Sequence, residues 1–318
     1  MSIEESNSTT AICASCQKSG KDINLKICVA CKMVRYCSVA CQKAHRPLHK
    51  KECKQRAKEL YDDELFKQPS SKGEECPICM ITFSSSRIGA SAAGLGSANM
   101  MSNYQLCCGK VICTGCMNEA VSGNPFNFPC PYCRVVVPVT NESLIENLTK
   151  RVEVHNDDKA MNKLAFEYQA GTRVTQNLNK AWKLWSRAAE MGNPSAHFNI
   201  ARIYMQGGID GVAVDLKKCQ YHLEQAAMGG HELARFNLGS LEGDCGKGER
   251  AKKHFMIGAR AGHEDSLNAI RDGYKAGYVT KDEYVSVLRA YKEVQDETKS
   301  ENREKMMKKI QRRMDQER

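Results

Sequence analysis

Fifteen of the seventeen cysteines in this chain fall within its first 133 residues, mostly in pairs of the form C-x2-C. Residues 1–12 contain no apolar segment of the kind that directs export, and no run of eighteen apolar residues occurs, so we expect a cytoplasmic or nuclear protein that is not secreted and spans no membrane. Paired thiols in a reducing compartment indicate zinc rather than disulfides. The cysteines therefore divide the chain into an N-terminal part that binds metal and a C-terminal part with few cysteines.

The charge balance depends on this interpretation. The formal net charge is +10 with every thiol counted as neutral. Fifteen thiolates holding four Zn²⁺ ions would lower the sum to about +3, because each zinc ligand must be deprotonated. Most of the basic excess disappears, so we expect no nucleic-acid partner.

Eight candidate zinc ligands lie in the first 53 residues, enough for two tetrahedral sites. They are Cys13, Cys16, Cys28, Cys31, Cys37, Cys41, His49 and Cys53. The last two are four residues apart, so on a helix they share one face. Chance placement of these groups within so short a segment is the alternative.

The segment resembles the MYND finger family through its two C-x2-C pairs, "RYCSVACQ" and "HKKEC", in that order. The resemblance implies crossed sites, with Cys13, Cys16, Cys37 and Cys41 on one ion and Cys28, Cys31, His49 and Cys53 on the other. It also implies a protein-interaction module of a kind that often binds short proline-containing peptides. The chain departs from the family at Arg46, near the place of a usual tryptophan. His45 is a competing ligand, or else a solvated helix position.

A second set of eight cysteines follows, and these suffice for two further ions without any histidine. They are Cys76, Cys79, Cys107, Cys108, Cys113, Cys116, Cys130 and Cys133. The segments "CPICM", "CCGKVICTGC" and "CPYCR" resemble an all-cysteine RING finger, with Cys108 in the place of the usual histidine and Lys110 outside the ligand set. The resemblance again implies crossed sites, with Cys76, Cys79, Cys113 and Cys116 on one ion and Cys107, Cys108, Cys130 and Cys133 on the other. A module that has lost one ion stays open as an alternative.

RING fingers commonly act as ubiquitin-protein ligases, and they hold a ubiquitin-conjugating enzyme without a nucleophile of their own. By resemblance, the surface for that enzyme would consist of Ile78, Phe128, Pro129, Pro131 and Arg134. The arginine would bridge the enzyme and ubiquitin by charge-assisted hydrogen bonds. The alternative is that Ile78 and Pro131 only pack the zinc sites and that Arg134 is solvated.

From residue 160 the chain repeats itself, with equivalent starts at Ala160, Ala196, Ala234 and Ser266. The second halves align without gaps as "AWKLWSRAAEMGN", "CQYHLEQAAMGGH" and "AKKHFMIGARAGH". A bulky residue, a small pair and a terminal glycine in each predict helical hairpins that stack into a solenoid. The segment resembles the Sel-one-like branch of the tetratricopeptide family. In the third repeat Glu242 replaces a tyrosine, which makes the local register uncertain.

The two remaining cysteines have ordinary explanations. Cys219 falls in a column of small packed residues, which argues against a nucleophile, and Cys245 lies in an altered turn. The tail carries eight Lys/Arg against four Asp/Glu and reads as a solvated helix. Its "KKIQRR" segment has the composition of a nuclear import signal.

The expected architecture is multidomain, with two small zinc-stabilised α+β modules (MYND and RING-like) followed by an all-α helical-hairpin solenoid. The boundaries are a disordered N-terminus at 1–12, the MYND finger at 13–53, a helical linker at 54–75, the RING finger at 76–134 with a flexible insertion at 84–103, a strand and a leading helix at 135–159, the solenoid at 160–297 and a charged helical tail at 298–318.

The combination looks like a group of algal RING and Sel-one-like repeat proteins. We therefore expect a zinc-binding, RING-type ubiquitin-protein ligase whose partners are a conjugating enzyme, ubiquitin and target proteins chosen by the solenoid and the MYND finger. The alternative is a non-enzymatic scaffold that only binds proteins.

Overall fold

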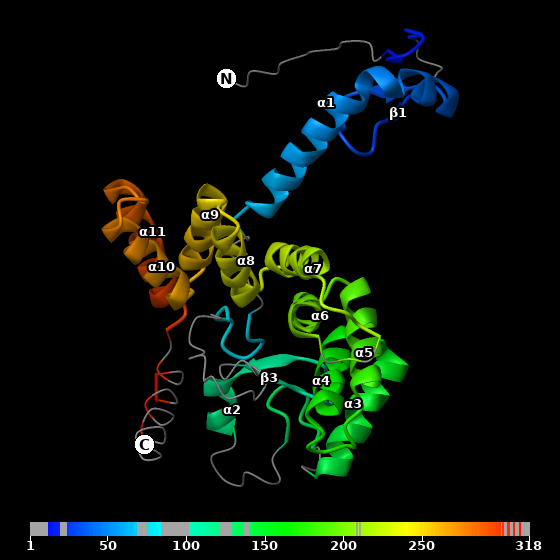
Figure 1. Cartoon of the computed structure of the whole chain (residues 1–318). Helices are drawn as coiled ribbons and strands as arrows, with labels where there is room; N and C mark the ends of the chain where they lie inside the picture. Colours follow the sequence, from blue (N-terminus) through cyan, green and yellow to red (C-terminus); the bar gives the residue numbers. More distant parts are fainter. Residues whose placement is uncertain are drawn as a thin grey trace, which may run out of the picture. The chain divides into compact units, whose positions relative to one another are not determined.

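The computed structural model describes residues 12–19, 24–68, 75–83, 102–120, 129–136, 140–207, 209 and 211–299, with five single positions in the tail (Figure 1). The chain divides into two compact units, Met1–Lys67 and Gln68–Arg318. Among the helices of the described part, none combines the length and the apolar character that a bilayer crossing requires.

The first unit is built on one long helix. Strands β1 (Lys26–Ile27) and β2 (Arg35–Tyr36) form a small antiparallel sheet, and helix α1 (Val39–Leu65) follows. The hydroxyl of Ser38 accepts the backbone N–H of Cys41 at 3.2 Å and caps the start of α1. The helix then runs without a break through the segment expected as a separate linker from residue 54, so the finger and the linker share one element.

The second unit begins with the second cysteine module. Strand β3 (Ser102–Tyr104) pairs antiparallel with β4 (Val111–Cys113), and helix α2 (Thr114–Ala120) follows. The expected insertion at 84–103 therefore ends in a strand, and its residues 84–101 lie outside the described part. Val136 makes only a single bridge to Pro129 where a strand was expected, and residues 137–139 are not described.

The rest of the second unit is helical. Its helices are α3 (Asn141–His155), α4 (Asp158–Ala170), α5 (Leu178–Glu190), α6 (Pro194–Gln206), α7 (Leu216–Met228), α8 (Glu232–Asp244), α9 (Gly248–Arg260), α10 (Glu264–Lys275) and α11 (Lys281–Glu297). From α4 onward, consecutive helices pair as hairpins and each hairpin packs against the next. The largest apolar core joins α3 to α6, with Trp185 and Met161 fully buried. This is the predicted solenoid.

The links between hairpins follow one design. Gly192, Gly230 and Gly262 adopt left-handed φ angles of +85°, +84° and +97°, which ends each second helix as predicted. The next residue then caps the following helix with its side chain. Asn193 accepts the N–H of Ala196, and in the two later repeats His231 and His263 fill the same role through Nδ1. The sequence alignment had assigned no role to this column.

The third repeat keeps its register despite the missing tyrosine. In the first two repeats, Lys180 and Lys218 lie over the rings of Tyr168 and Tyr204, with 5.1 and 5.2 Å between nitrogen and ring centre. In the third repeat, the equivalent Arg250 contacts both carboxylate oxygens of Glu242 at 2.9 and 3.0 Å. Glu242 is only 1% exposed. An ion pair, in which both carboxylate oxygens accept from Nε of the arginine, thus replaces a cation–π pair at the same position.

Candidate metal centres

The first unit brings its eight candidate ligands into the two crossed groups that the resemblance implied. Within each group the ligand atoms all lie within 4.8 Å of one another. The groups are Cys13, Cys16, Cys37 and Cys41, and Cys28, Cys31, His49 and Cys53. Helix α1 serves both, because it carries Cys41 for the first group and His49 with Cys53 for the second.

The distances within these groups fit zinc. Sulfur atoms 2.3 Å from a tetrahedral Zn²⁺ lie about 3.8 Å apart, and a sulfur and an imidazole nitrogen about 3.5 Å apart. The Sγ atoms of Cys28 and Cys53 are 3.7 Å apart, and Cys31 Sγ lies 3.2 Å from His49 Nε2. A disulfide would need about 2.05 Å. These contacts are better understood as edges of ligand tetrahedra than as thiol hydrogen bonds.

Residues outside the ligand set complete the second of these sites. The ring of His45 is nearly parallel to that of His49, with 5.7 Å between ring centres. Its Nδ1 lies 3.0 Å from the hydroxyl of the buried Tyr36. His45 is therefore half-buried, belongs to none of the four-ligand groups, and stacks beside the ligand ring of His49.

The second module forms two further crossed groups. They are Cys76, Cys79, Cys113 and Cys116, and Cys107, Cys108, Cys130 and Cys133. Sulfur–sulfur distances of 3.9 Å from Cys79 to Cys113, and also from Cys108 to Cys130, again match a zinc tetrahedron. In the described part of the chain four clusters thus fit Zn²⁺, two in each module.

The same backbone turn builds four of the cysteine pairs, Cys13–Cys16, Cys28–Cys31, Cys76–Cys79 and Cys130–Cys133. After the second cysteine, the residues Gln17, Lys32, Met80 and Arg134 all adopt left-handed φ angles between 54° and 65°. Each donates its N–H to the carbonyl of the first cysteine in its pair, at 2.8 to 2.9 Å. These turns direct backbone N–H groups at sulfur, and hydrogen bonds from Cys16 and Cys37 lower the pKa of Cys13 to about 6.

The adjacent cysteines at 107 and 108 follow a modified version of this turn. Gly109 has a φ of +70° and donates its N–H to the carbonyl of Gln105 at 2.8 Å. In this turn Gln105 stands where the other turns have their first cysteine, and Cys108 stands where they have their second. Because Gln105 has no thiol, Cys107 supplies the other ligand atom. This explains how two neighbouring residues reach one cluster.

Gly109 has a further reason to be glycine. At the other four turns a larger residue tolerates the same left-handed angle, so the turn alone does not require it. A Cβ atom on Gly109 would collide with the guanidinium of Arg151 on helix α3, which Tyr104 and Asp157 hold in place by hydrogen bonds. The missing side chain thus allows the solenoid to approach the zinc cluster closely.

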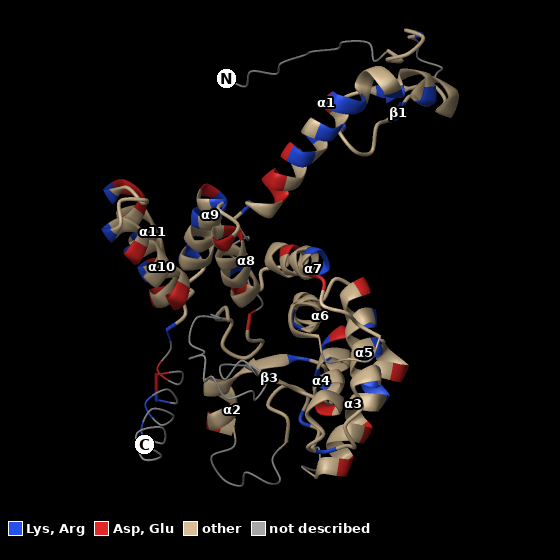
Figure 2. Cartoon of the chain, viewed as in Figure 1, with Lys and Arg blue, Asp and Glu red and all other residues tan. Residues whose placement is uncertain are grey.

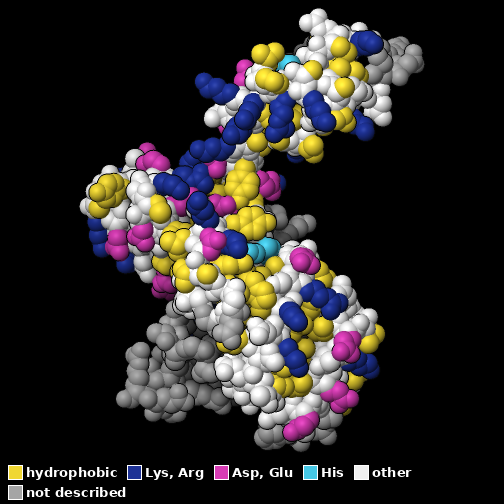
Figure 3. Space-filling view, turned by 45° about the vertical axis from the view of Figure 1, so that its right-hand side comes forward, with side chains coloured by type: hydrophobic (Ala, Val, Ile, Leu, Met, Phe, Trp, Pro, Cys, Tyr) yellow, Lys and Arg dark blue, Asp and Glu magenta, His cyan; other side chains and the backbone are white. Residues whose placement is uncertain are grey.

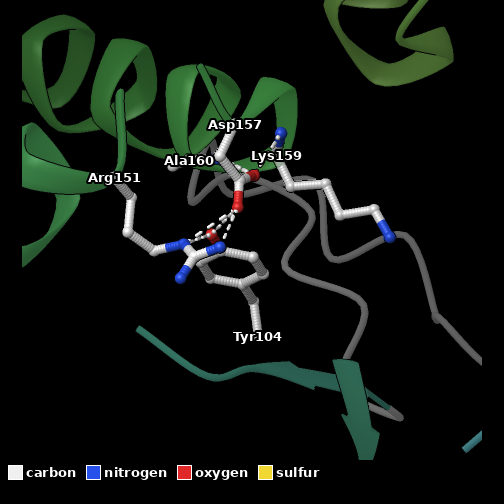
Figure 4. A network of polar contacts seen from close by, with 5 residues as sticks. All are labelled: Tyr104, Arg151, Asp157, Lys159 and Ala160. Atoms are coloured by element: carbon white, nitrogen blue, oxygen red, sulfur yellow. Dashed lines mark hydrogen bonds and ion pairs between the residues drawn. The ribbon is translucent and has the colours of Figure 1, made fainter. Parts of the chain in front are cut away.

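Arg151 belongs to a network that joins the module to the solenoid (Figure 4). Its guanidinium donates to Oδ2 of Asp157 at 2.7 and 2.9 Å and to the hydroxyl of Tyr104 at 2.7 Å. The tyrosine hydroxyl in turn donates to the same carboxylate oxygen, while Oδ1 of Asp157 caps α4 through the N–H groups of Lys159 and Ala160. One carboxylate therefore connects β3, α3 and α4.

Burial accompanies this network. The side chains of Arg151 and Asp157 are 14% and 13% exposed, and Tyr104 and Leu106 pack against the solenoid core. Burial opposes ionisation of Asp157, but Tyr104, the N–H of Ala160 and Arg151 together hold its pKa below the ordinary value. Burial, followed by the bond to Asp157, raises the pKa of Tyr104.

The surface that the RING resemblance assigned to a conjugating enzyme is only partly described. Ile78 and Arg134 are exposed, Pro131 is half-buried, and Pro129 is exposed and bridges to Val136. Phe128 lies outside the described residues. Lys110 is no member of a ligand group, since its ammonium lies over the ring of Tyr132 at 5.7 Å.

Family models match two parts of the chain. Residues 13–53 match the MYND finger, and residues 158–193 and 194–231 each match the Sel1 repeat. The RING resemblance of the second module stays a prediction.

Two curated relatives come from Schizosaccharomyces pombe. Chitin synthase regulatory factor 4 is 33% identical over 86 residues, 27% of this chain and 13% of that protein. SET domain and MYND-type zinc finger protein 6 is 41% identical over 54 residues, 17% of this chain and 11% of that protein. The aligned part therefore spans only about an eighth of either relative.

Among solved structures, a Sel1 repeat protein from Oxalobacter formigenes aligns with a TM-score of 0.42 and 22% identity, covering 48% of this chain and 64% of that one. The antigen c5321 from uropathogenic Escherichia coli aligns with a TM-score of 0.40 and 28% identity, covering 49% and 33%. The family matches and the metal clusters together show a cysteine-rich N-terminal region that contains a MYND finger and fits Zn²⁺, followed by a helical solenoid that contains two Sel1 repeats.

Proposed function

We propose that this protein is a zinc-dependent adaptor that acts as a RING-type ubiquitin-protein ligase. Its second module would hold a ubiquitin-conjugating enzyme, while the solenoid and the MYND finger would bind the target. MYND fingers and Sel1 repeats both suit protein–protein interaction. The observation that carries the ligase proposal is the second module, whose crossed cysteine groups present apolar side chains to solvent.

These apolar side chains come from the two cysteine turns that flank the module. Ile78 and Met80 are 43% and 70% exposed on the first turn, and Tyr132 is 46% exposed on the last. Cys76 and Cys130 of the two turns belong to one buried cluster, so the turns are parts of the same small body. Exposed apolar residues on a rigid, metal-held turn are suited to docking because little conformational entropy is lost on binding.

Arg134 fits the proposed role of a bridging cation. It follows the last cysteine in a left-handed turn that fixes its backbone, and its side chain is exposed. Within the described part of the chain no ion pair involves it. A guanidinium held in this way can donate hydrogen bonds to two partner proteins at once.

The docked arrangement of the second module also supports the proposal. A ligase must hold its conjugating enzyme at a defined distance from the target. The Tyr104, Arg151 and Asp157 network joins the module to the first helices of the solenoid, so a target held by the repeats would have a fixed orientation toward the module.

In-vitro autoubiquitination with a panel of conjugating enzymes tests the proposal. We expect Ile78→Ala and Arg134→Ala each to reduce the rate by about 10-fold or more, which corresponds to about 1.4 kcal/mol. Val154→Ala is the matched control, since Val154 is an equally apolar side chain, 67% exposed on α3, and belongs to neither of the two turns. Activity that both turn variants retain at the level of this control would contradict the proposed surface.

A non-enzymatic scaffold is the second candidate. One curated relative is named as a regulatory factor, and both shown domain types bind proteins. This candidate predicts no ubiquitin transfer with any conjugating enzyme of the panel from protein that holds four zinc ions. Transfer that depends on Ile78 would exclude it.

A further inference from the structure

A groove of about 220 Å³ lies on the first unit, between α1 and the loop that carries the second zinc group. Its apolar floor is lined by Ala30, Ala57 and Tyr36 together with the zinc ligands Cys28, His49 and Cys53. Its helical wall is formed by Gln42, Arg46, Lys50 and Lys54, which recur every four residues and so form one row along α1. The groove therefore combines an apolar floor with a row of cations.

The groove lies in the basic part of α1, and three of the cations there line it. From residue 43 to residue 58, α1 carries seven Lys/Arg and a single acid, Glu52, whereas its last turns are acidic (Figure 2). No acidic residue lines the groove, and no ion pair in the described part of the chain involves Arg46, Lys50 or Lys54. In the view of Figure 3, several Lys and Arg side chains of the first unit lie near one another with hydrophobic side chains between them.

Bound zinc does not cancel this charge. Three thiolates, one neutral imidazole and one Zn²⁺ carry a net charge of −1 at the adjacent site. Three cations on the groove wall leave an excess of +2. In a hollow next to a low-dielectric wall, such an excess attracts an anionic ligand.

We propose that this groove binds an acidic peptide segment that carries apolar residues. The occupant is a partner protein in an extended conformation, with its carboxylates against Arg46, Lys50 and Lys54 and an apolar side chain over Ala30. The proposal concerns binding by the first unit alone, so it stands or fails independently of the ligase activity proposed for the second module.

The spacing of the cations sets the spacing of the acids. Residues four apart on a helix are about 6 Å apart along its axis. Alternate residues of an extended chain are about 6.6 Å apart. Acidic residues at every second position therefore match the row, and this pattern differs from the proline-containing peptides that the MYND resemblance suggested. Arg46, near the place of the usual family tryptophan, is the residue that changes the preference.

A nucleic acid is the other polyanion that a basic helix could attract. The structure favours a peptide because the aromatic ring in the groove, Tyr36, is only 4% exposed and offers no face for stacking bases. The remaining floor consists of small apolar surfaces, which suit aliphatic side chains.

Fluorescence anisotropy with the full-length, zinc-loaded protein tests this. The probe is a short labelled peptide in which Asp alternates with Leu, and its controls replace Asp by Asn, replace Leu by Ser, or contain alternating Pro and Leu. We expect the Asp–Leu peptide to bind at least about 10-fold more tightly than each control, with affinity that falls as salt rises. Equal affinity for the Asn peptide or the proline peptide would overturn the proposal.

Charge-removing variants locate the site. Arg46→Gln, Lys50→Gln and Lys54→Gln should each weaken binding by about 3- to 10-fold. Lys51→Gln and Lys58→Gln remove equal charges from α1 outside the groove, and we expect less than about a 2-fold change. Equal losses in both sets would mean non-specific attraction and would contradict the site. Displacement of the peptide by an equimolar oligonucleotide of matched charge would assign the surface to nucleic acid instead.

Discussion

The two cysteine modules place their ligand groups in the same crossed order, but the chain supports them differently. The first module obtains its ligands from two short strands and from α1, and its buried residues, such as Tyr36, pack against its own cysteines. The second module extends its packing into the solenoid through Tyr104 and Leu106. A small zinc module can thus complete its apolar core with residues of a neighbouring domain. Zinc binding to the module and the stability of that domain are then thermodynamically linked.

The largest expected effect comes from cutting this link. Arg151→Ala leaves Asp157 buried without its guanidinium partner, which should lower the free energy of unfolding of the second unit by about 3 to 5 kcal/mol. Urea denaturation followed by tryptophan fluorescence measures this, because the only tryptophans, Trp182 and Trp185, lie in α5 of the solenoid. A loss below about 1 kcal/mol would mean that the network contributes little to the fold.

Gly109→Ala should have the next largest effect. The new methyl group would collide with Arg151, and we expect a loss of about 2 to 3 kcal/mol. In an Arg151→Ala background the collision is absent, so the same substitution should cost only the left-handed strain of about 1 kcal/mol. Equal costs in the two backgrounds, measured by the same denaturation, would show that the turn and not the close approach requires glycine.

Acid should weaken the solenoid through one of its histidine caps. Burial lowers the pKa of His231 to about 4, against about 6.5 for an exposed histidine, so the unfolded chain takes up the proton first as the pH falls. Stability is therefore complete above about pH 6.5 and declines toward pH 4, by about 2 kcal/mol between pH 7 and pH 5.

His231→Asn is the matched variant, because Asn193 already caps the equivalent helix in the first repeat. It should keep the cap and remove that part of the pH dependence. Since zinc release by acid affects both proteins alike, the difference between them isolates the histidine. Identical pH profiles for the variant and the natural protein would contradict the assignment.

The smallest effect is expected in the first module. Lys32 holds a left-handed φ of +54° after Cys31, with no neighbour that requires its side chain to be absent. Lys32→Gly should relieve strain and stabilise the zinc-loaded finger by up to about 1 kcal/mol. Competition for zinc with a chromophoric chelator measures this. A clear weakening of zinc affinity would show that the lysine has a role that the turn does not explain.

Much of this molecule could be predicted from residue spacing. The two sets of candidate ligands, the helix that carries His49 and Cys53, and the helical hairpins from residue 160 follow from local patterns, because ligand spacing and small-residue periodicity reflect local geometry. The crossed grouping of the ligands was implied by the resemblance to MYND and RING fingers. The repeats are predictable because most of their contacts are close in sequence, whereas ligands of one zinc cluster can be 37 residues apart.

The missed features depend on partners far apart in the chain. Nothing near Tyr104 indicates that its hydroxyl meets Asp157, 53 residues away. Glu242 looked like a break in the repeat because its partner, Arg250, lies in the following helix. Two signals in the sequence could have indicated these contacts. In the third repeat, arginine replaces the lysine of the first two repeats just where glutamate replaces their tyrosine. Gly109 is the one glycine among the residues that directly follow a cysteine pair.

The most direct test of the account is the effect of zinc removal on the solenoid. Denaturation is followed through Trp182 and Trp185 before and after a chelator has removed the metal, in the natural protein and in Arg151→Ala. The account predicts that chelation lowers the midpoint for the natural protein and lowers it much less for the variant, in which the module is already uncoupled. A midpoint that stays unchanged in the natural protein, while metal analysis shows that all zinc has been removed, would contradict it.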